Sequence, residues 1–437
     1  MAKRSKKQAR RLRNLVMVCT MCAIVLTVST YAWFIGMKTV SVSTFDVDIA
    51  TTEGLFLSMD GVNWTYKLDA KGATPYEGHT NTWAPDGLIP MSTVGDMDDT
   101  VSRMKLFEKA SLTTTPGGFR LLTSRVDNYN NGTDGKILQG KGYVAFDLFI
   151  KNISGEHYYE TNQPLNEEAI YLTTNSAVTV ANDGIANTGI ENSVRVAFTQ
   201  IGRVKADTES AANITGITCS DVAKSDGQVQ VTGICRDAQI WEPNDTDHVK
   251  NAISWYDTAC ATRKETGTNE TLKESYNIAI ESTPKTNCGT VVDGTSYATY
   301  AVSRAITTDD HVDVYDGEIY NTYEANSMTY EDYLDADKTG AKLVSYPYFT
   351  DTMKDKTGTD RPTFMTLAPN SITKLRVYIY IEGQDIDNYD FASLGAKISV
   401  NFGFTKERFT ETDIDYQGPS TDITPTKSDE VVATPAE

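Results

Sequence analysis

The chain has 437 residues, of which 40% are apolar and 10% aromatic. This length predicts two or three domains, or one large β domain with insertions. The formal net charge is −19, and residues 1–13 carry seven Lys or Arg side chains without one acid, so the remainder is more acidic still. A body this acidic excludes nucleic-acid binding by neutralisation of phosphates, and it favours solubility.

A basic arm (residues 1–14) precedes an uncharged apolar run (residues 15–37). As a helix, this run is long enough to cross a bilayer core of about 30 Å. The cations precede the run, which predicts a cytoplasmic N-terminus and an extracellular body. The run is either an uncleaved anchor or a signal peptide, because Thr30 and Ala32 place small residues at the −3 and −1 positions of a cut before Trp33. We therefore expect a location at the cell membrane or cell surface, with secretion if the chain is cut after Ala32.

The end of this run carries a short motif, Thr30-Tyr31-Ala32-Trp33-Phe34, and a β-prone stretch (residues 40–49) follows it. This arrangement resembles the signal peptides of exported proteins that are cut by a SipW-type peptidase, the camelysin and TasA-like family. Residues 143–152 (YVAFDLFIKN) also resemble a strand ending in Lys-Asn that recurs in that family. The family usually has an acidic residue after the aromatic pair, where this chain has Ile35. The resemblance implies a β-sandwich with a role at the surface or in the extracellular matrix.

Alternation of apolar and polar residues predicts half-buried strands at 144–150, 193–199, 375–382 and 397–405. Clusters of Asn, Asp and Gly separate these strands, and helical patterns are confined to residues 245–257 and to one turn at 331–337. The pattern indicates an all-β protein, an antiparallel β-sandwich or jelly roll preceded by one N-terminal apolar helix.

The strongest strand patterns flank a region with weaker alternation. We expect a discontinuous β-sandwich made of residues 38–200 and 361–412, with residues 201–360 inserted as a β-rich subdomain. Two consecutive domains are the alternative. Residues 413–437 contain few core-forming side chains and are expected to be a disordered tail.

Four cysteines lie outside the apolar run and are disulfide candidates: Cys219, Cys235, Cys260 and Cys288. An even number of cysteines in an exported region allows three pairings. The sequential pairing, Cys219 with Cys235 and Cys260 with Cys288, closes the shortest loops. Buried reduced thiols are the alternative.

No catalytic motif emerges, and we expect a protein that is not an enzyme. The four histidines, none within four residues of another, are His79, His157, His248 and His311. They supply no zinc motif of the HExxH kind. Glu382 and Asp385 end the clearest strand, a place where functional acids and turn-forming acids both occur.

No cofactor is expected apart from weak Ca²⁺ binding. Asp335, Asp337 and Thr339 match the first half of an EF-hand loop, but position 12 is Tyr346 and not the bidentate Glu. A second acidic cluster comprises Asp309, Asp310, Asp313, Asp316 and Glu318. Solvated loops are the alternative at both places.

These observations favour an exported structural protein of the cell surface or extracellular matrix. A fibre subunit assembling by β-strand addition through residues 39–49 fits this class, with copies of itself or other surface proteins as partners. The alternative is a membrane-tethered adhesin or glycan-binding module that uses aromatic side chains such as Trp64, Trp83, Trp241 and Trp255. An exported hydrolase is the third hypothesis.

Overall fold

The structure is a computed structural model, and it describes residues 41–47, 54–70, 82–83, 87–108, 111–115, 118–122, 128–130, 137–140, 142–154, 167–181, 184–223, 229–263, 291–297, 300–304, 311–312, 317–318, 342–389, 392 and 397–406. Within these ranges the protein is all-β, with several mostly antiparallel sheets and few helices. The expected N-terminal apolar helix (residues 15–37), the turn at 331–337 and the tail (residues 413–437) lie outside the described residues.

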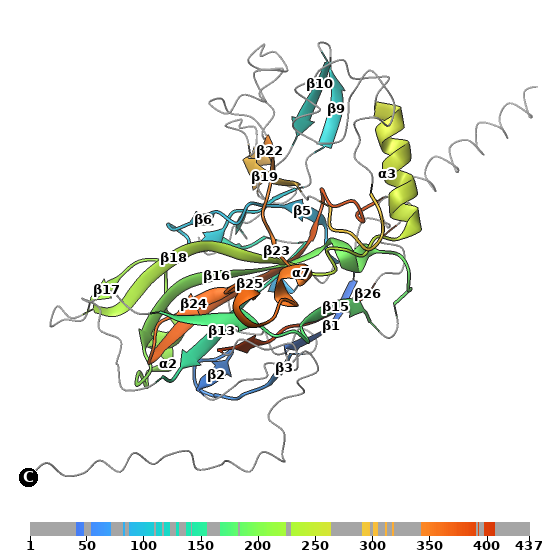
Figure 1. The fold of residues 1–437 in the computed structure, drawn as a ribbon. Coiled ribbons are helices and arrows are strands. Elements are labelled where there is room, and N and C mark those ends of the chain that lie inside the picture. The colour runs from blue at the N-terminus through green and yellow to red at the C-terminus, as the bar shows by residue number, and fades with distance from the viewer. Residues whose placement is uncertain are drawn as a thin grey trace, which may run out of the picture.

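The largest sheet has ten strands, and four long strands form its centre (Figure 1). The main path runs in the order β17 (Val222–Ala223), β18 (Val229–Glu242), β16 (Val194–Lys205), β25 (Ser371–Glu382), β13 (Val144–Asn152) and β2 (Leu55–Ser58). Shorter strands extend this path: β4 (Thr82–Trp83), β5 (Pro90–Ser92), β8 (Phe107–Glu108) and β23 (Phe349–Thr350).

A four-stranded sheet lies beneath the long strands in Figure 1. Its order is β15 (Ala177–Val180), β26 (Lys397–Asn401), β1 (Ser41–Val47) and β3 (Leu68–Ala70). The strand β1 pairs in parallel with β26, with Phe45 opposite Val400, and in antiparallel with β3, with Phe45 opposite Ala70. The first described strand, β1, therefore lies beside β26, which only β27 follows in the chain.

The remaining strands form smaller sheets. A three-stranded sheet contains β24 (Met365–Leu367), β14 (Glu168–Leu172) and β27 (Phe404–Thr405). The two-stranded pairs are β6 (Met97–Asp98) with β7 (Arg103–Met104), β9 (Ser111–Thr115) with β10 (Gly118–Leu122), β11 (Asn128–Asn130) with β12 (Ile137–Gln139), β19 (Tyr300–Arg304) with β22 (Lys342–Ser345), and β20 (His311–Val312) with β21 (Gly317–Glu318).

The described helices are few, and all except α3 are short. They are α2 (Ala211–Thr215), α3 (Lys250–Arg263), α7 (Asp351–Lys354) and the 3-10 helices η2 (Ile190–Ser193) and η3 (Gly358–Asp360). The helix expected at 245–257 is α3, shifted towards the C-terminus. None of the helices in the described ranges is long and apolar enough to cross a membrane.

The expected strands form, with two differences, and the expected domain boundary also differs. The pattern at 397–405 predicts one strand, but Phe402 and Gly403 interrupt it, so β26 and β27 belong to different sheets. The pattern in β13 and β25 predicts half-buried strands, whereas both faces of each strand are buried. The expected domain boundary after residue 200 falls inside β16, and β18 continues the same sheet, so any inserted unit begins after β18.

The main hydrophobic core draws on both the ten-stranded and the four-stranded sheet. From β13 it takes Val144, Phe146, Leu148 and Ile150, and from β26 it takes Ile398 and Val400. The Phe198 ring of β16 lies 5.2 Å from Phe364, 5.0 Å from Phe402 and 5.4 Å from Phe404 between ring centroids. These edge-to-face contacts join β16 to the C-terminal strands.

Two smaller clusters cover the opposite face of the ten-stranded sheet. One packs Tyr143, Tyr378 and Tyr380 against Met91, Met104 and Leu106. The other packs Phe149 and Ile372 against Ile214 and Ile217, which lie in or just after α2. Residues before β9 and residues around α2 therefore cover this face of the ten-stranded sheet. The alternation of apolar and polar residues predicts that the same face is exposed.

We predict that Phe198→Ala lowers the free energy of unfolding by about 3–5 kcal/mol, because it removes a ring at the centre of the main core. Chemical denaturation followed by tryptophan fluorescence measures the change. The control is Val62→Ala at a side chain that is 60% exposed, which should stay within about 0.5 kcal/mol of wild type. Equal losses in the two variants would contradict the assigned core.

Candidate functional site

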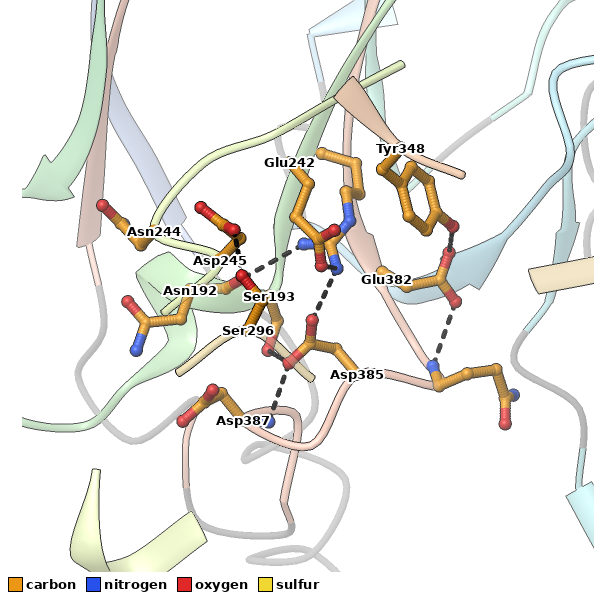
Figure 2. A network of polar contacts seen from close by, with 12 residues as sticks. Asn192, Ser193, Glu242, Asn244, Asp245, Ser296, Tyr348, Glu382, Asp385 and Asp387 are labelled. Atoms are coloured by element: carbon orange, nitrogen blue, oxygen red, sulfur yellow. Dashed lines mark hydrogen bonds and ion pairs between the residues drawn. The ribbon is translucent and has the colours of Figure 1, made fainter. Parts of the chain in front are cut away.

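The two strand-end acids of the sequence analysis, Glu382 and Asp385, belong to a buried polar network (Figure 2). The network forms where β16 begins and where β18 and β25 end. The chain reverses after Glu382, and the Gly383 N–H donates to the Met91 carbonyl at 2.6 Å. The turn thus places Asp385 and Asp387 beside the start of β16.

Arg195 is the cation at the centre of this network, and its side chain is fully buried. Its Nη2 donates to Glu242 Oε1 and, at 2.6 Å, to Asp385 Oδ2. Its Nη1 donates to the carbonyls of Asn192 and Val194 at 3.1 and 3.0 Å. Burial by itself would lower the pKa of Arg195, but Glu242 and Asp385 raise it above the ordinary arginine value, so the guanidinium stays charged.

Glu382 lies on the other side of the guanidinium. The ring of Tyr348 stacks against Arg195 at 4.8 Å, and the Tyr348 hydroxyl donates to Glu382 Oε2 at 3.1 Å. The N–H of Gln384 donates to Glu382 Oε1 at 3.0 Å. Burial raises the pKa of Glu382 from 4.5 to about 8, against the opposing effect of Arg195. The carboxyl is therefore mostly protonated at neutral pH, and the carboxyl groups that bind Arg195 directly are those of Glu242 and Asp385.

A second part of the network centres on His248. Its Nδ1 lies 2.8 Å from Asp387 Oδ2, and its Nε2 lies 3.1 Å from the Thr295 carbonyl. A carbonyl only accepts, so Nε2 carries a hydrogen and Nδ1 shares a proton with Asp387. Burial would lower the pKa of His248, but the hydrogen bond and charge of Asp387 raise it. Burial also raises the pKa of Asp387, so the pair retains a proton.

This geometry does not form a serine–histidine nucleophile pair. Ser193 Oγ donates to Asp385 Oδ1 at 3.4 Å, and both ring nitrogens of His248 are engaged elsewhere. A serine nucleophile needs a ring nitrogen that accepts its proton. Asp245, which accepts from Ser296 Oγ and from the Thr352 N–H and hydroxyl, is likewise committed to holding segments together.

The other candidate residues have different locations. Thr30, Ala32, Trp33, Asp335, Asp337 and Thr339 lie outside the described residues, as do His79, His157 and, apart from the backbone of Glu318 in β21, the second acidic cluster. In the part of the chain that the structure describes, no three His, Cys, Asp or Glu side chains are grouped to hold a metal ion. Trp241 is a core residue whose Nε1 donates to Asp351 at 2.7 Å.

A disulfide joins Cys219 and Cys235, and it connects the segment before β17 to β18. The other expected pair involves Cys260 in α3 and Cys288, which lies outside the described residues. The pairing of these two cysteines stays a prediction.

Sequence reasoning found Glu382 and Asp385 by their place at a strand end, but it missed Arg195, Glu242 and the His248–Asp387 pair. The one local signal was a charged residue, Arg195, inside an apolar strand. Comparison with known proteins found no protein-family model, no curated protein and no solved structure that matches this chain.

We predict that Glu382→Gln changes the pH dependence of stability. The pKa of Glu382 is raised in the folded state, so its carboxyl stabilises the fold fully below pH 4.5. This stabilisation is lost as pH rises through about 8. Glutamine cannot ionise, so the variant does not lose this stabilisation. The free energy of unfolding of the variant minus that of wild type should therefore rise by on the order of 2 kcal/mol or more between pH 5 and pH 9. Denaturant unfolding at several pH values measures this difference.

The matched control is Glu209→Gln, which changes an exposed carboxyl in the same way. Its stability difference from wild type should stay nearly constant over the same range. If the Glu382→Gln difference is equally flat, Glu382 is not a buried, protonated carboxyl.

Proposed function

We propose that the chain is an exported, non-enzymatic structural protein of the cell surface or extracellular matrix, and that copies of it assemble by β-strand addition. The supporting observation is the place of β1, which lies at the N-terminal end of the described body and pairs on both edges with β26 and β3. Its register with β26 extends from Ser41 to Asp46. Such a strand can leave its sheet without unthreading any other element.

A β1 strand from a second copy would satisfy the same backbone donors and acceptors of β26 and β3. Recognition by strand addition relies on main-chain hydrogen bonds, so an identical segment is an ideal replacement. An exchanged strand also avoids leaving an open sheet edge, which is a liability in isolation. Repetition along a row of subunits would make a fibre.

Export is supported by two features. The basic arm and the apolar run of residues 15–37 have the order of a signal or anchor segment. The disulfide between Cys219 and Cys235 is of a kind that persists in oxidising compartments outside the cytoplasm. The non-enzymatic role is supported by the network around Arg195, whose acids and histidine are engaged in joining segments.

Export and release are tested by N-terminal sequencing and intact mass of protein from the medium and from the membrane fraction. We expect a start at Trp33, because the residues before it suit a signal peptidase. Ala32→Leu, which places a bulky residue at −1, should retain the protein in the membrane fraction. An uncut N-terminus in the wild-type protein would contradict release and favour a tethered adhesin or glycan-binding protein.

Strand exchange is tested with two single variants, Thr44→Cys and Ser399→Cys, which are register partners in β1 and β26. Mixed, co-assembled and oxidised, they should give a disulfide-linked dimer on a non-reducing gel, because β1 of one copy lies beside β26 of another. Thr100→Cys, at an exposed turn, replaces Ser399→Cys in the control mixture and should give no link. A double variant that carries both Thr44→Cys and Ser399→Cys is the second control. If this variant forms the disulfide within one chain and the mixture of single variants forms none between chains, β1 stays in its own chain.

A further inference from the structure

Three side chains with complementary chemistry meet where β13 ends, beside β14 and β27. Asn152 is the last residue of β13, Glu168 is the first residue of β14, and Lys406 follows β27 directly. The β27 strand is held there by pairing with β14, with Thr405 opposite Tyr171. The three side chains therefore come from three segments that the sheets fix in place.

The side-chain amide of Asn152 is fully buried. Its Nδ2 donates to Glu168 Oε2 at 2.8 Å and to the Ala368 carbonyl at 3.0 Å. Two acceptors around one atom fix the orientation of the amide, because the oxygen could not take that place. Its Oδ1 has no hydrogen-bond partner within the described part of the chain. A buried polar atom without a partner is uncommon and requires an explanation.

Lys406 approaches the same carboxylate. Its Nζ lies 3.1 Å from Glu168 Oε2 and donates to the carbonyl of Ile153, the residue after Asn152, at 3.1 Å. One carboxylate oxygen thus touches the amine of Lys406 and the amide nitrogen of Asn152. The two nitrogens are no farther apart than the sum of these two contacts.

From this juxtaposition we propose that Lys406 and Asn152 form an intramolecular amide crosslink, with Glu168 as the proton carrier. The Lys406 ammonium gives a proton to Glu168 Oε2, and the neutral Nζ attacks Asn152 Cγ. A bond forms between Nζ and Cγ, and the bond between Cγ and Nδ2 breaks. Glu168 returns its proton to the leaving nitrogen, which also takes the second amine hydrogen and departs as an ammonium ion. No oxidant, reductant or cofactor takes part.

The surroundings of Glu168 keep its carboxylate ionised. Burial alone would raise its pKa, but hydrogen bonds from Ser154 and Asn152 and the contact with Lys406 lower it. The carboxylate is therefore ionised, and its Oε2, which contacts both nitrogens, is placed to pass a proton from one to the other. A group that holds nucleophile and leaving group in place also removes much of the entropic barrier to their reaction.

A lysine–carboxylate contact elsewhere in the structure, which is more deeply buried, lacks these features. Lys374 Nζ lies 3.0 Å from Asp147 Oδ2, but Arg376 also binds that carboxylate, through Nε at 2.7 Å and Nη2 at 3.2 Å. A carboxylate that is ionised and doubly paired is a poor electrophile, and no amide is present there. The inference is therefore specific to Asn152 and Lys406. It holds for a single copy and does not depend on assembly.

Mass spectrometry of the purified full chain tests the crosslink. After disulfide reduction, the intact mass should fall short of the mass calculated from its determined N-terminus by one ammonia molecule. Trypsin should release one branched peptide that joins residues 152–195 and 398–408, with no cleavage after Lys406. A full-length mass with two linear peptides from folded protein would overturn the proposal, as would deamidation at Asn152 without a link.

Variants separate the three roles. Lys406→Arg keeps a cation for Glu168 but should have the full unlinked mass, and Asn152→Ala should behave likewise. Glu168→Gln keeps both reacting groups and should reduce the linked fraction at least tenfold, because glutamine accepts no proton. The matched control is Lys151→Arg, since Lys151 adjoins Asn152 but its Nζ lies over the Trp64 ring at 5.4 Å. This control should link fully, and an undiminished link in Glu168→Gln would overturn the role of Glu168.

Discussion

The structure depends on burying both faces of its long central strands, β13, β25 and β16. One face meets the four-stranded sheet and is apolar, whereas the other carries charges that must be paired when covered. Arg376 binds Asp147, and Arg195 binds Glu242 and Asp385, so each cation has a carboxylate partner. Removing one partner of such a pair leaves an uncompensated buried charge, at a cost of roughly 3–5 kcal/mol. The charged pairs thus fix which segments cover the sheet.

Polar groups also fasten the two opposite ends of the sheet, in different ways. Around Arg195 the ends of β18 and β25 meet the start of β16, and one ionised cluster holds them. Around Asn152 the end of β13 meets β14 and the residue after β27, and a single carboxylate bridges an amide and an amine. In the first cluster, carboxyl groups surround the positive charge of Arg195. In the second, the amine of Lys406 is a nucleophile and the amide of Asn152 is an electrophile. Similar residue types therefore serve different chemistry, because one set encloses a cation and the other an amide.

Alternation was sufficient to locate β13, β16 and β25, since the apolar face of each strand repeats every second residue. It was not sufficient to show that the polar face is buried. That face is covered by segments far away in the sequence, such as the residues around Met104 and Ile214. The place of Glu382 at a strand end was visible, but its neighbours were not. Arg195 reaches Glu242 across a strand pair with register shifts near Gln200, and no local pattern encodes such irregularities.

The parallel pairing of β1 with β26 has a consequence for the order of folding. Ribosomes make β1 before any other described strand, whereas β26 appears only when almost the whole chain has been made. Contacts between such distant segments form slowly, because a long loop must close first. The four-stranded sheet is therefore incomplete throughout synthesis, and β1 has only β3 as a nearby partner. A nascent chain that ends before residue 397 presents an open strand edge, which makes truncated products candidates for misassembly.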